Sequence, residues 1–119
     1  MYIKKIEWLN QEIKEAVVTI SNDKIELKCF SHPFNMKKSD KITEIIECLS
    51  VNNIYISYRK EYYIEYYDGN LTYRLCGKLI DKKNGIMQFE DIKLYIGEYI
   101  PGDIQNDDYI IVTISRLDI

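Results

Sequence analysis

Apolar and polar residues alternate with a period of two along much of the chain. This period predicts β-strands, because successive side chains of a strand point to opposite faces of a sheet. The clearest examples are Ala16 to Ile20 and Ile25 to Phe30. Between them, residues 21–24 read Ser-Asn-Asp-Lys, and Asn and Asp favour turns because they tolerate positive φ. The pattern therefore predicts a hairpin over residues 16–30.

Two segments fit both a helix and a strand. Residues 42–49 place four apolar residues at helical spacing, which predicts one or two helical turns: Ile42, Ile45, Ile46 and Leu49. At the N-terminus, Ile3, Ile6 and Ile13 suit a helix, whereas Ile6 and Trp8 suit a strand. We favour a strand there, because the rest of the chain is patterned for β-structure.

Two further hairpins are predicted at turns that contain glycine. Asp68-Gly69 separates two alternating segments and is typical of a two-residue type I′ turn, which would pair Tyr67 with Asn70. A three-residue loop would shift this pairing by one residue on one strand. One face of this hairpin would belong to the core: Tyr62, Ile64, Tyr66, Leu71, Tyr73 and Leu75. The other face would point outward: Tyr63, Glu65, Tyr67, Thr72 and Arg74. Asn84-Gly85 predicts a second hairpin between residues 78–83 and 86–89.

The last predicted strand, Tyr109 to Leu117, is apolar on both sides near its start, which is typical of a strand inside a sheet. Many short strands closed by turns rich in Asn, Asp and Gly predict an all-β fold. We expect a small OB-like barrel or compact sandwich of about five to seven strands, with room for one short helix near 42–49. The length of 119 residues predicts a single domain over residues 1–119.

Composition and charge narrow the partners that the chain is expected to have. The chain is 46% hydrophobic, which excludes intrinsic disorder. Its net charge of −3 disfavours nucleic acid and anionic membranes, because both are bound largely through an excess of Lys and Arg. No segment approaches the roughly 18 consecutive apolar residues of a membrane helix.

The cysteines indicate the compartment. Cys29, Cys48 and Cys76 are odd in number, widely spaced and in no CxxC pair, which is typical of reduced proteins. Glu7 interrupts the apolar stretch that a signal peptide would need. These features predict a cytoplasmic protein.

The sequence contains few of the residue patterns that are typical of catalytic or metal-binding sites. His32 is the single histidine and forms a CxxH pair with Cys29, but zinc needs three or four ligands. A hydrolytic triad would have to be built on the same histidine, and no nucleophile elbow or glycine-rich phosphate loop is present. We therefore expect no metal, no cofactor and no enzymatic activity.

Tyrosine is the unusual feature, with eleven in the chain and seven of them between residues 55 and 73. Strand propensity alone explains many tyrosines, because the ring fits a half-buried pleated surface. A functional interpretation is a binding surface made by Tyr63, Tyr67, Arg74 and Lys78, since Tyr and Arg are enriched at protein-binding hot spots.

Four short segments carry a resemblance: Ile6-Glu7-Trp8-Leu9, Cys29-Phe30-Ser31-His32-Pro33, Ile100-Pro101-Gly102-Asp103 and Arg116-Leu117-Asp118. In these segments the chain resembles short uncharacterised all-β proteins of low-GC Gram-positive bacteria. The resemblance implies no function and no site residue.

The function expected from the sequence is a non-catalytic intracellular protein-binding module, for example an immunity protein that neutralises a toxin. The alternative is a single-stranded nucleic-acid-binding OB-like domain, in which exposed aromatics stack on bases beside Lys and Arg. Both hypotheses use the same tyrosine-rich surface, and the oligomeric state stays open.

Overall fold

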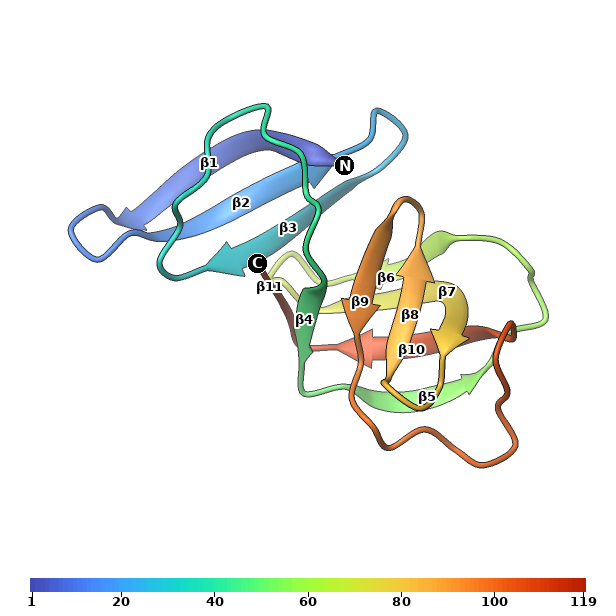
Figure 1. Ribbon diagram of the computed structural model, residues 1–119. Helices are drawn as coiled ribbons and strands as arrows, with labels where there is room; N and C mark the ends of the chain where they lie inside the picture. The colour runs from blue at the N-terminus through green and yellow to red at the C-terminus, as the bar shows by residue number, and fades with distance from the viewer.

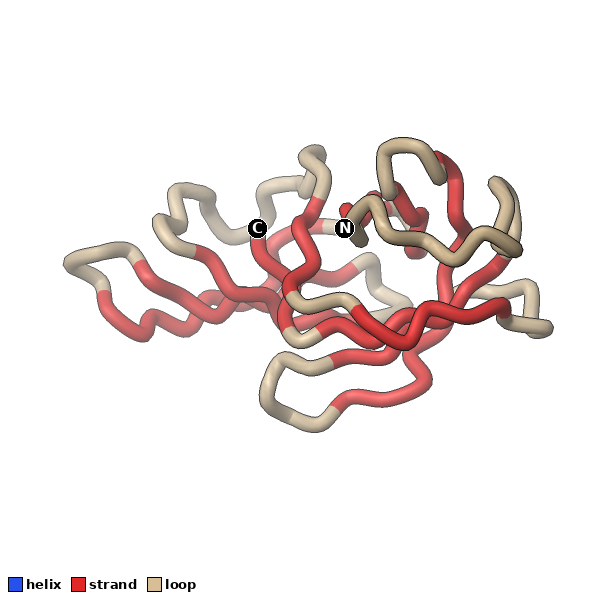
Figure 2. The backbone as a smooth tube through the Cα atoms, turned by 90° about the horizontal axis from the view of Figure 1, so that it is seen from below, coloured by secondary structure: helices blue, strands red, loops and turns tan.

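The computed structural model describes all 119 residues and contains eleven strands and no helix (Figure 1; Figure 2). The strands are β1 (Tyr2–Asn10), β2 (Glu15–Ser21), β3 (Glu26–Ser31), β4 (Ile46–Leu49), β5 (Asn52–Ile56), β6 (Tyr63–Tyr67), β7 (Tyr73–Asp81), β8 (Ile86–Phe89), β9 (Ile92–Tyr95), β10 (Tyr109–Ile114) and β11 (Arg116–Asp118). The fold is therefore all-β, as the period of two predicts. No helix long and apolar enough to cross a membrane is present.

The strands form one open mixed sheet, in the order β1-β2-β3-β11-β4-β9-β8-β7-β10-β5, with β6 paired to β7. Most neighbours are antiparallel, whereas β11–β3 and β4–β9 are parallel. β10 and β11 are separated only by Ser115, and β4 and β5 only by residues 50–51. These two bent segments pair with one another, β10 with β5 and β11 with β4.

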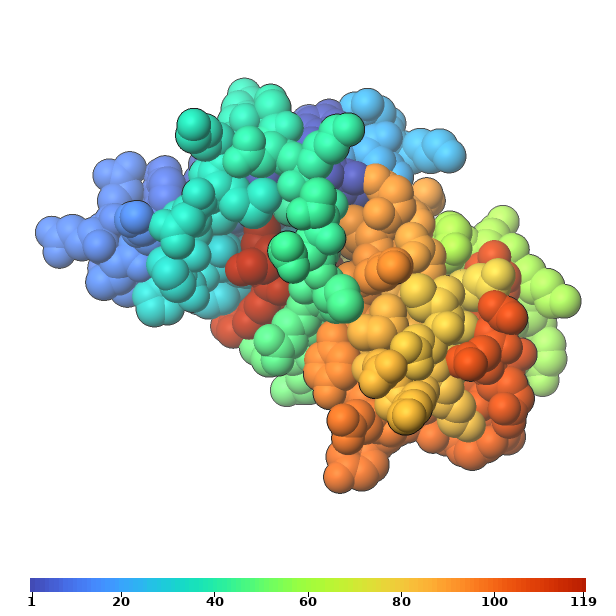
Figure 3. All heavy atoms as spheres, viewed as in Figure 1, coloured from blue at the N-terminus to red at the C-terminus, as the bar shows by residue number.

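The predicted barrel of five to seven strands is not confirmed. The sheet is open, and it has more strands because bends divide long segments and because strands as short as the three residues of β11 are paired. The β1–β2 hairpin projects from the rest of the molecule (Figure 3). The whole molecule is elongated, with extents of 45 × 26 × 25 Å along its three principal axes.

The predicted helix over 42–49 is wrong. Residues 42–45 form a loop that follows an isolated bridge between Lys41 and Tyr2 of β1, and β4 begins at Ile46. In β4 the side chains of Ile46 and Cys48 are buried, while that of Glu47 is exposed. The pairing of β4 with β9 and β11 overrides the helical spacing, because those two neighbours satisfy its backbone hydrogen bonds in the extended form.

The N-terminal segment is a strand, as we favour above, and it pairs along its length with β2. A single cluster of 23 buried hydrophobic residues forms the core. It includes Ile3 and Val18 of the N-terminal strands together with Leu75 and Val112 of the C-terminal half. Both halves of the chain are thus packed around one continuous interior.

Candidate functional site

Two rows of side chains cross the outer side of strands β5, β10, β7 and β6. Directly opposite residues in neighbouring strands share a face, so the ladder partners identify each row. The first row is Tyr55, Ile111, Cys76 and Tyr63. The second row is Asn52, Thr113, Arg74 and Tyr66. Aromatic and basic side chains from β5, β6 and β7 therefore lie on one side of the sheet.

The connection between β5 and β6 covers the middle of the first row. Ser57 N donates a hydrogen bond to Tyr109 O at 2.8 Å, and Cys76 Sγ lies 3.8 Å from Arg59 O. Cys76 is consequently buried under this loop, and burial raises the pKa of its thiol. The loop carries Tyr58 at its surface, with 95% of the side chain exposed.

Both arginines of this surface are held against tyrosine rings. The guanidinium carbon of Arg59 lies 4.0 Å from the ring centroid of Tyr63, and that of Arg74 lies 5.9 Å from the Tyr66 ring. Arg59 also forms an ion pair with Glu61, and Arg74 Nε donates to Thr113 Oγ1 at 3.3 Å. Stacked and bonded in this way, the arginines lose little further freedom when a partner binds.

We define the outer tyrosine face as the surface made by these six residues: Tyr55, Tyr58, Arg59, Tyr63, Tyr66 and Arg74. Tyr55 is 45% exposed and Tyr66 is 50% exposed, although both are large and partly apolar. Sequence reasoning found Tyr63 and Arg74 but missed Tyr55, Tyr58, Arg59 and Tyr66. The run of tyrosines was the one signal in the sequence that pointed to them.

The prediction that Tyr67 points outward is wrong, and so is the assignment of Tyr66 to the core. In β6, Ile64 pairs with Leu75 and Tyr66 pairs with Arg74, so Glu65 is an extra residue in the strand. Such a bulge shifts the alternation by one residue and exchanges the two faces beyond it. Tyr66 therefore takes the outward position that alternation assigns to Tyr67.

The predicted two-residue turn at Asp68-Gly69 is also wrong, because the loop has five residues, 68–72. Asp68 Oδ1 accepts hydrogen bonds from the amides of Asn70 at 2.6 Å and Thr72 at 3.2 Å. Leu71 has a φ of 71°, so the loop contains a second left-handed residue besides Gly69. These two hydrogen bonds to the Asp68 carboxylate stabilise the longer loop. Tyr67 consequently pairs with Tyr73 instead of Asn70.

Lys78 lies at the margin of the outer tyrosine face. It follows Arg74 by four residues on β7, a separation of about 13 Å along a strand. Its Nζ is 3.7 Å from Asp107 Oδ1. Of the four residues that the sequence predicted, the structure thus brings Tyr63 and Arg74 together, leaves Lys78 apart and turns Tyr67 to the other side.

Tyr67 and Tyr73 form a stacked pair, with ring centroids 4.4 Å apart and planes inclined by 17°. The Tyr73 hydroxyl accepts a hydrogen bond from Lys28 N at 2.8 Å, whereas the buried Tyr67 hydroxyl has no partner within the protein. An unpaired buried hydroxyl destabilises the folded state by about 1–3 kcal/mol. The two rings therefore share one stacking contact, but only the Tyr73 hydroxyl has a hydrogen-bond partner within the protein.

The variant Tyr67→Phe is expected to raise the free energy of unfolding by about 1 kcal/mol, because it removes the unpaired hydroxyl and keeps the stacked ring. The matched variant Tyr73→Phe is expected to lower it by a similar amount, since it leaves the Lys28 amide without its acceptor. Urea denaturation measures both. If the two variants shift the midpoint in the same direction, the assignment of the two hydroxyls is wrong.

The residues of the CxxH pair do not come together as a site. The Cys29 side chain is completely buried in the core and burial raises the pKa of its thiol, whereas His32 is exposed beyond the end of β3. No group of three or more His, Cys, Asp or Glu side chains is arranged to hold a metal ion. The candidate functional site is therefore the outer tyrosine face and not the CxxH pair.

No family model matches the chain, and it matches neither a curated protein nor a solved structure.

Proposed function

We propose that this chain is a non-catalytic module that binds another protein through the outer tyrosine face. The observation that carries the proposal is the pair of cross-strand rows, which place tyrosines beside Arg74 on one side of the sheet, with Arg59 of the β5–β6 connection against the Tyr63 ring. Tyrosine and arginine supply much of the binding energy in protein interfaces, where the ring is buried and the polar end finds a hydrogen bond.

The arrangement of this surface favours binding because most of it is already ordered. Tyr55, Tyr63 and Tyr66 lie on paired strands, so their backbones lose no further freedom in a complex. Ordering side chains on association is one of the main terms that weaken an interface, and tyrosine has only two side-chain torsions to restrict. We expect the partner to present apolar side chains to the rings and a carboxylate to Arg74, which has no acidic partner of its own.

Charge favours a protein partner over single-stranded nucleic acid. Glu61 is paired with Arg59, and the bulged Glu65 lies in β6 near Cys76. Acidic groups among the cations reduce the excess of positive charge that affinity for phosphates requires. A labelled oligonucleotide at low salt tests this alternative, and binding that is lost in Tyr66→Ala would favour nucleic acid instead.

A photo-crosslinking experiment in the native cell tests the protein-binding proposal. A benzophenone amino acid in place of Tyr66 is expected to give a discrete adduct with one protein. The control position is Tyr99, which is 96% exposed but lies in the connection between β9 and β10, outside the outer tyrosine face. Identical adducts from both positions, or none from Tyr66, would contradict the proposal.

The crosslinked protein is then purified and its affinity measured by calorimetry. Tyr66→Ala and Arg74→Ala are each expected to weaken binding about tenfold or more, which corresponds to about 1.4 kcal/mol. Tyr99→Ala is expected to leave the affinity unchanged. An affinity that is insensitive to Tyr66 and Arg74 would show that the partner binds elsewhere.

We place this activity in the reducing cytoplasm as part of the proposal. All three cysteines are free and buried, and burial raises the pKa of each thiol. Buried neutral thiols pack as small hydrophobic groups and need no oxidising compartment.

A further inference from the structure

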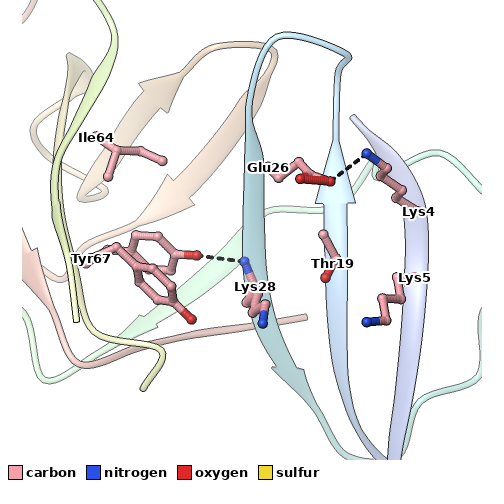
Figure 4. Close-up of a pocket in the computed structure, with 8 residues that line it drawn as sticks. Lys4, Lys5, Thr19, Glu26, Lys28, Ile64 and Tyr67 are labelled. Atoms are coloured by element: carbon pink, nitrogen blue, oxygen red, sulfur yellow. Dashed lines mark hydrogen bonds and ion pairs between the residues drawn. The ribbon is translucent and has the colours of Figure 1, made fainter. Parts of the chain in front are cut away.

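A cavity lies on the side of the β6–β7 pair that is opposite to the outer tyrosine face, between this pair and strands β1, β2 and β3 (Figure 4). Its volume is about 420 Å³, within the range of small-molecule sites, about 300–1,000 Å³. It is lined by Lys4, Lys5, Thr19, Glu26, Lys28, Ile64, Tyr67 and Tyr73. No part of the outer tyrosine face belongs to this lining.

One wall of the cavity is basic because of an irregularity in β1. Ile3 pairs with Ile20 and Lys5 pairs with Thr19, so Lys4 is an extra residue between them. This bulge lets two consecutive lysines line the same cavity, where regular alternation would point them to opposite faces. Figure 4 shows Lys4 and Lys5 on the same side of the cavity as Thr19 and Lys28.

Lys5, Thr19 and Lys28 form a row across β1, β2 and β3. Lys5 Nζ has a carboxylate partner in Glu7 at 2.8 Å, whereas Lys28 has none. Thr19 lies between the two lysines, and its hydroxyl makes no hydrogen bond within the protein. The centre of the row thus combines a free ammonium group with a free hydroxyl.

Lys4 is paired with Glu26, Nζ to Oε1 at 2.6 Å, and both side chains are half-exposed. Lys4 and Lys5 are thus each paired with a carboxylate, so the three lysines of the lining leave one excess positive charge, that of Lys28. This positive site stands out in a chain whose net charge is −3. A concave, partly enclosed surface strengthens the attraction of such a group of charges for an anion.

The opposite wall is made by Ile64 and the stacked Tyr67 and Tyr73. The Tyr73 hydroxyl is fixed by the Lys28 amide, as described above. The Tyr67 hydroxyl is buried and has no partner within the protein, so it can donate to an oxygen of a bound molecule. One wall of the cavity thus offers lysines and the Thr19 hydroxyl to an anionic ligand, and the opposite wall offers apolar surface and the Tyr67 hydroxyl.

We propose that this cavity binds a small phosphorylated molecule. Its phosphate lies between Lys5, Lys28 and the Thr19 hydroxyl, and its organic part rests against Ile64 and Tyr67. Phosphate fits better than a carboxylate, because several lysines acting as point charges suit a dianion, whereas carboxylates are matched by the planar fork of arginine. The site is independent of the proposed protein-binding surface.

Isothermal titration calorimetry with AMP, inorganic phosphate and adenosine tests the proposal. Inorganic phosphate is expected to bind weakly, AMP at least about fivefold more tightly, and adenosine not at all, with affinity falling as salt is added. A lack of saturable phosphate binding at millimolar concentration would overturn the proposal. So would AMP binding no tighter than inorganic phosphate, because the organic part would then add nothing.

Variants locate the site. Lys28→Met is expected to weaken AMP binding about tenfold, because it removes the unpaired charge and keeps an extended apolar side chain. Lys83→Met, at an exposed lysine of the β7–β8 turn, removes the same charge outside the cavity and is expected to change nothing. Equal weakening in both variants would overturn the site.

Tyr67→Phe separates a ligand-binding role from a structural one. It is expected to weaken AMP binding several-fold although the unliganded protein becomes more stable. Tyr66→Ala, on the outer tyrosine face, is expected to leave AMP binding unchanged, so failure of either proposal is visible without the other. Unchanged AMP affinity in Tyr67→Phe would overturn the hydrogen bond from the Tyr67 hydroxyl to the ligand.

Discussion

A chain that ends at Asn106 is expected to lose its cooperative fold. The segment removed contains β10 and β11, and β10 pairs with β7 on one side and with β5 on the other. Four side chains of the removed segment are fully buried: Ile110, Val112, Ile114 and Leu117. Burial of four such residues contributes about 6–12 kcal/mol. That range is similar to the whole net stability of a typical domain, about 5–15 kcal/mol.

Circular dichroism and thermal melting measure this loss, and a cooperative melt of the shortened chain would contradict it.

Two point variants test the same strand in the full chain. Val112→Asp puts a charge at a completely buried position and is expected to lower the free energy of unfolding by about 4 kcal/mol or more. Thr113→Asp, one residue further and facing Arg74, is expected to change it by less than about 1 kcal/mol.

The variant Gly85→Ala is expected to be the most damaging substitution of a single small residue in the chain. Gly85 has a φ of +68°, which disfavours any residue with a Cβ by about 1–2 kcal/mol. A Cβ atom here would also lie 2.0 Å from the carbonyl oxygen of Gly97, so backbone would have to move. The Gly85 carbonyl accepts a hydrogen bond from Ile96 N at 2.8 Å, and this contact holds the end of β9 beside the turn.

We expect Gly85→Ala to lower the free energy of unfolding by about 3–5 kcal/mol, the sum of backbone strain and the forced separation of the two segments. Gly69→Ala is the matched control, because its φ is +84° but no atom lies within 4 Å of the added Cβ. It is expected to lose only the conformational part, about 1–2 kcal/mol. Urea denaturation of both proteins distinguishes the two contributions. Equal losses would show that the contact with Gly97 has no energetic weight.

The two proposed sites share one structural cause, which is a strand bulge. The bulge at Glu65 turns Tyr66 to the outer tyrosine face and Tyr67 toward the cavity. The bulge at Lys4 brings two adjacent lysines to that cavity. A binding surface on a sheet needs side chains that simple alternation does not place together, and bulges are one way in which strands provide them.

Alternation in the sequence was sufficient to predict the all-β class and the hairpins around residues 21–24 and at Asn84-Gly85, whereas the strand at the N-terminus was favoured only because the rest of the chain is patterned for β-structure. These features depend on neighbours in the chain: the period of two follows from strand geometry, and Asn, Asp and Gly adopt the turn conformations. Tyr63 and Arg74 were placed on a common surface for the same reason, since both lie on the regular part of their strands.

The order of the strands, the open sheet and the make-up of both sites depend on contacts between residues far apart in the sequence. The helical spacing of residues 42–49 was overridden by the pairing of β4 with β9 and β11. Tyr67 turned inward because one extra residue, Glu65, is accommodated in β6 opposite β7. Local patterns define which side of a strand is apolar, but a bulge or a distant pairing partner is selected only by the free energy of the assembled sheet.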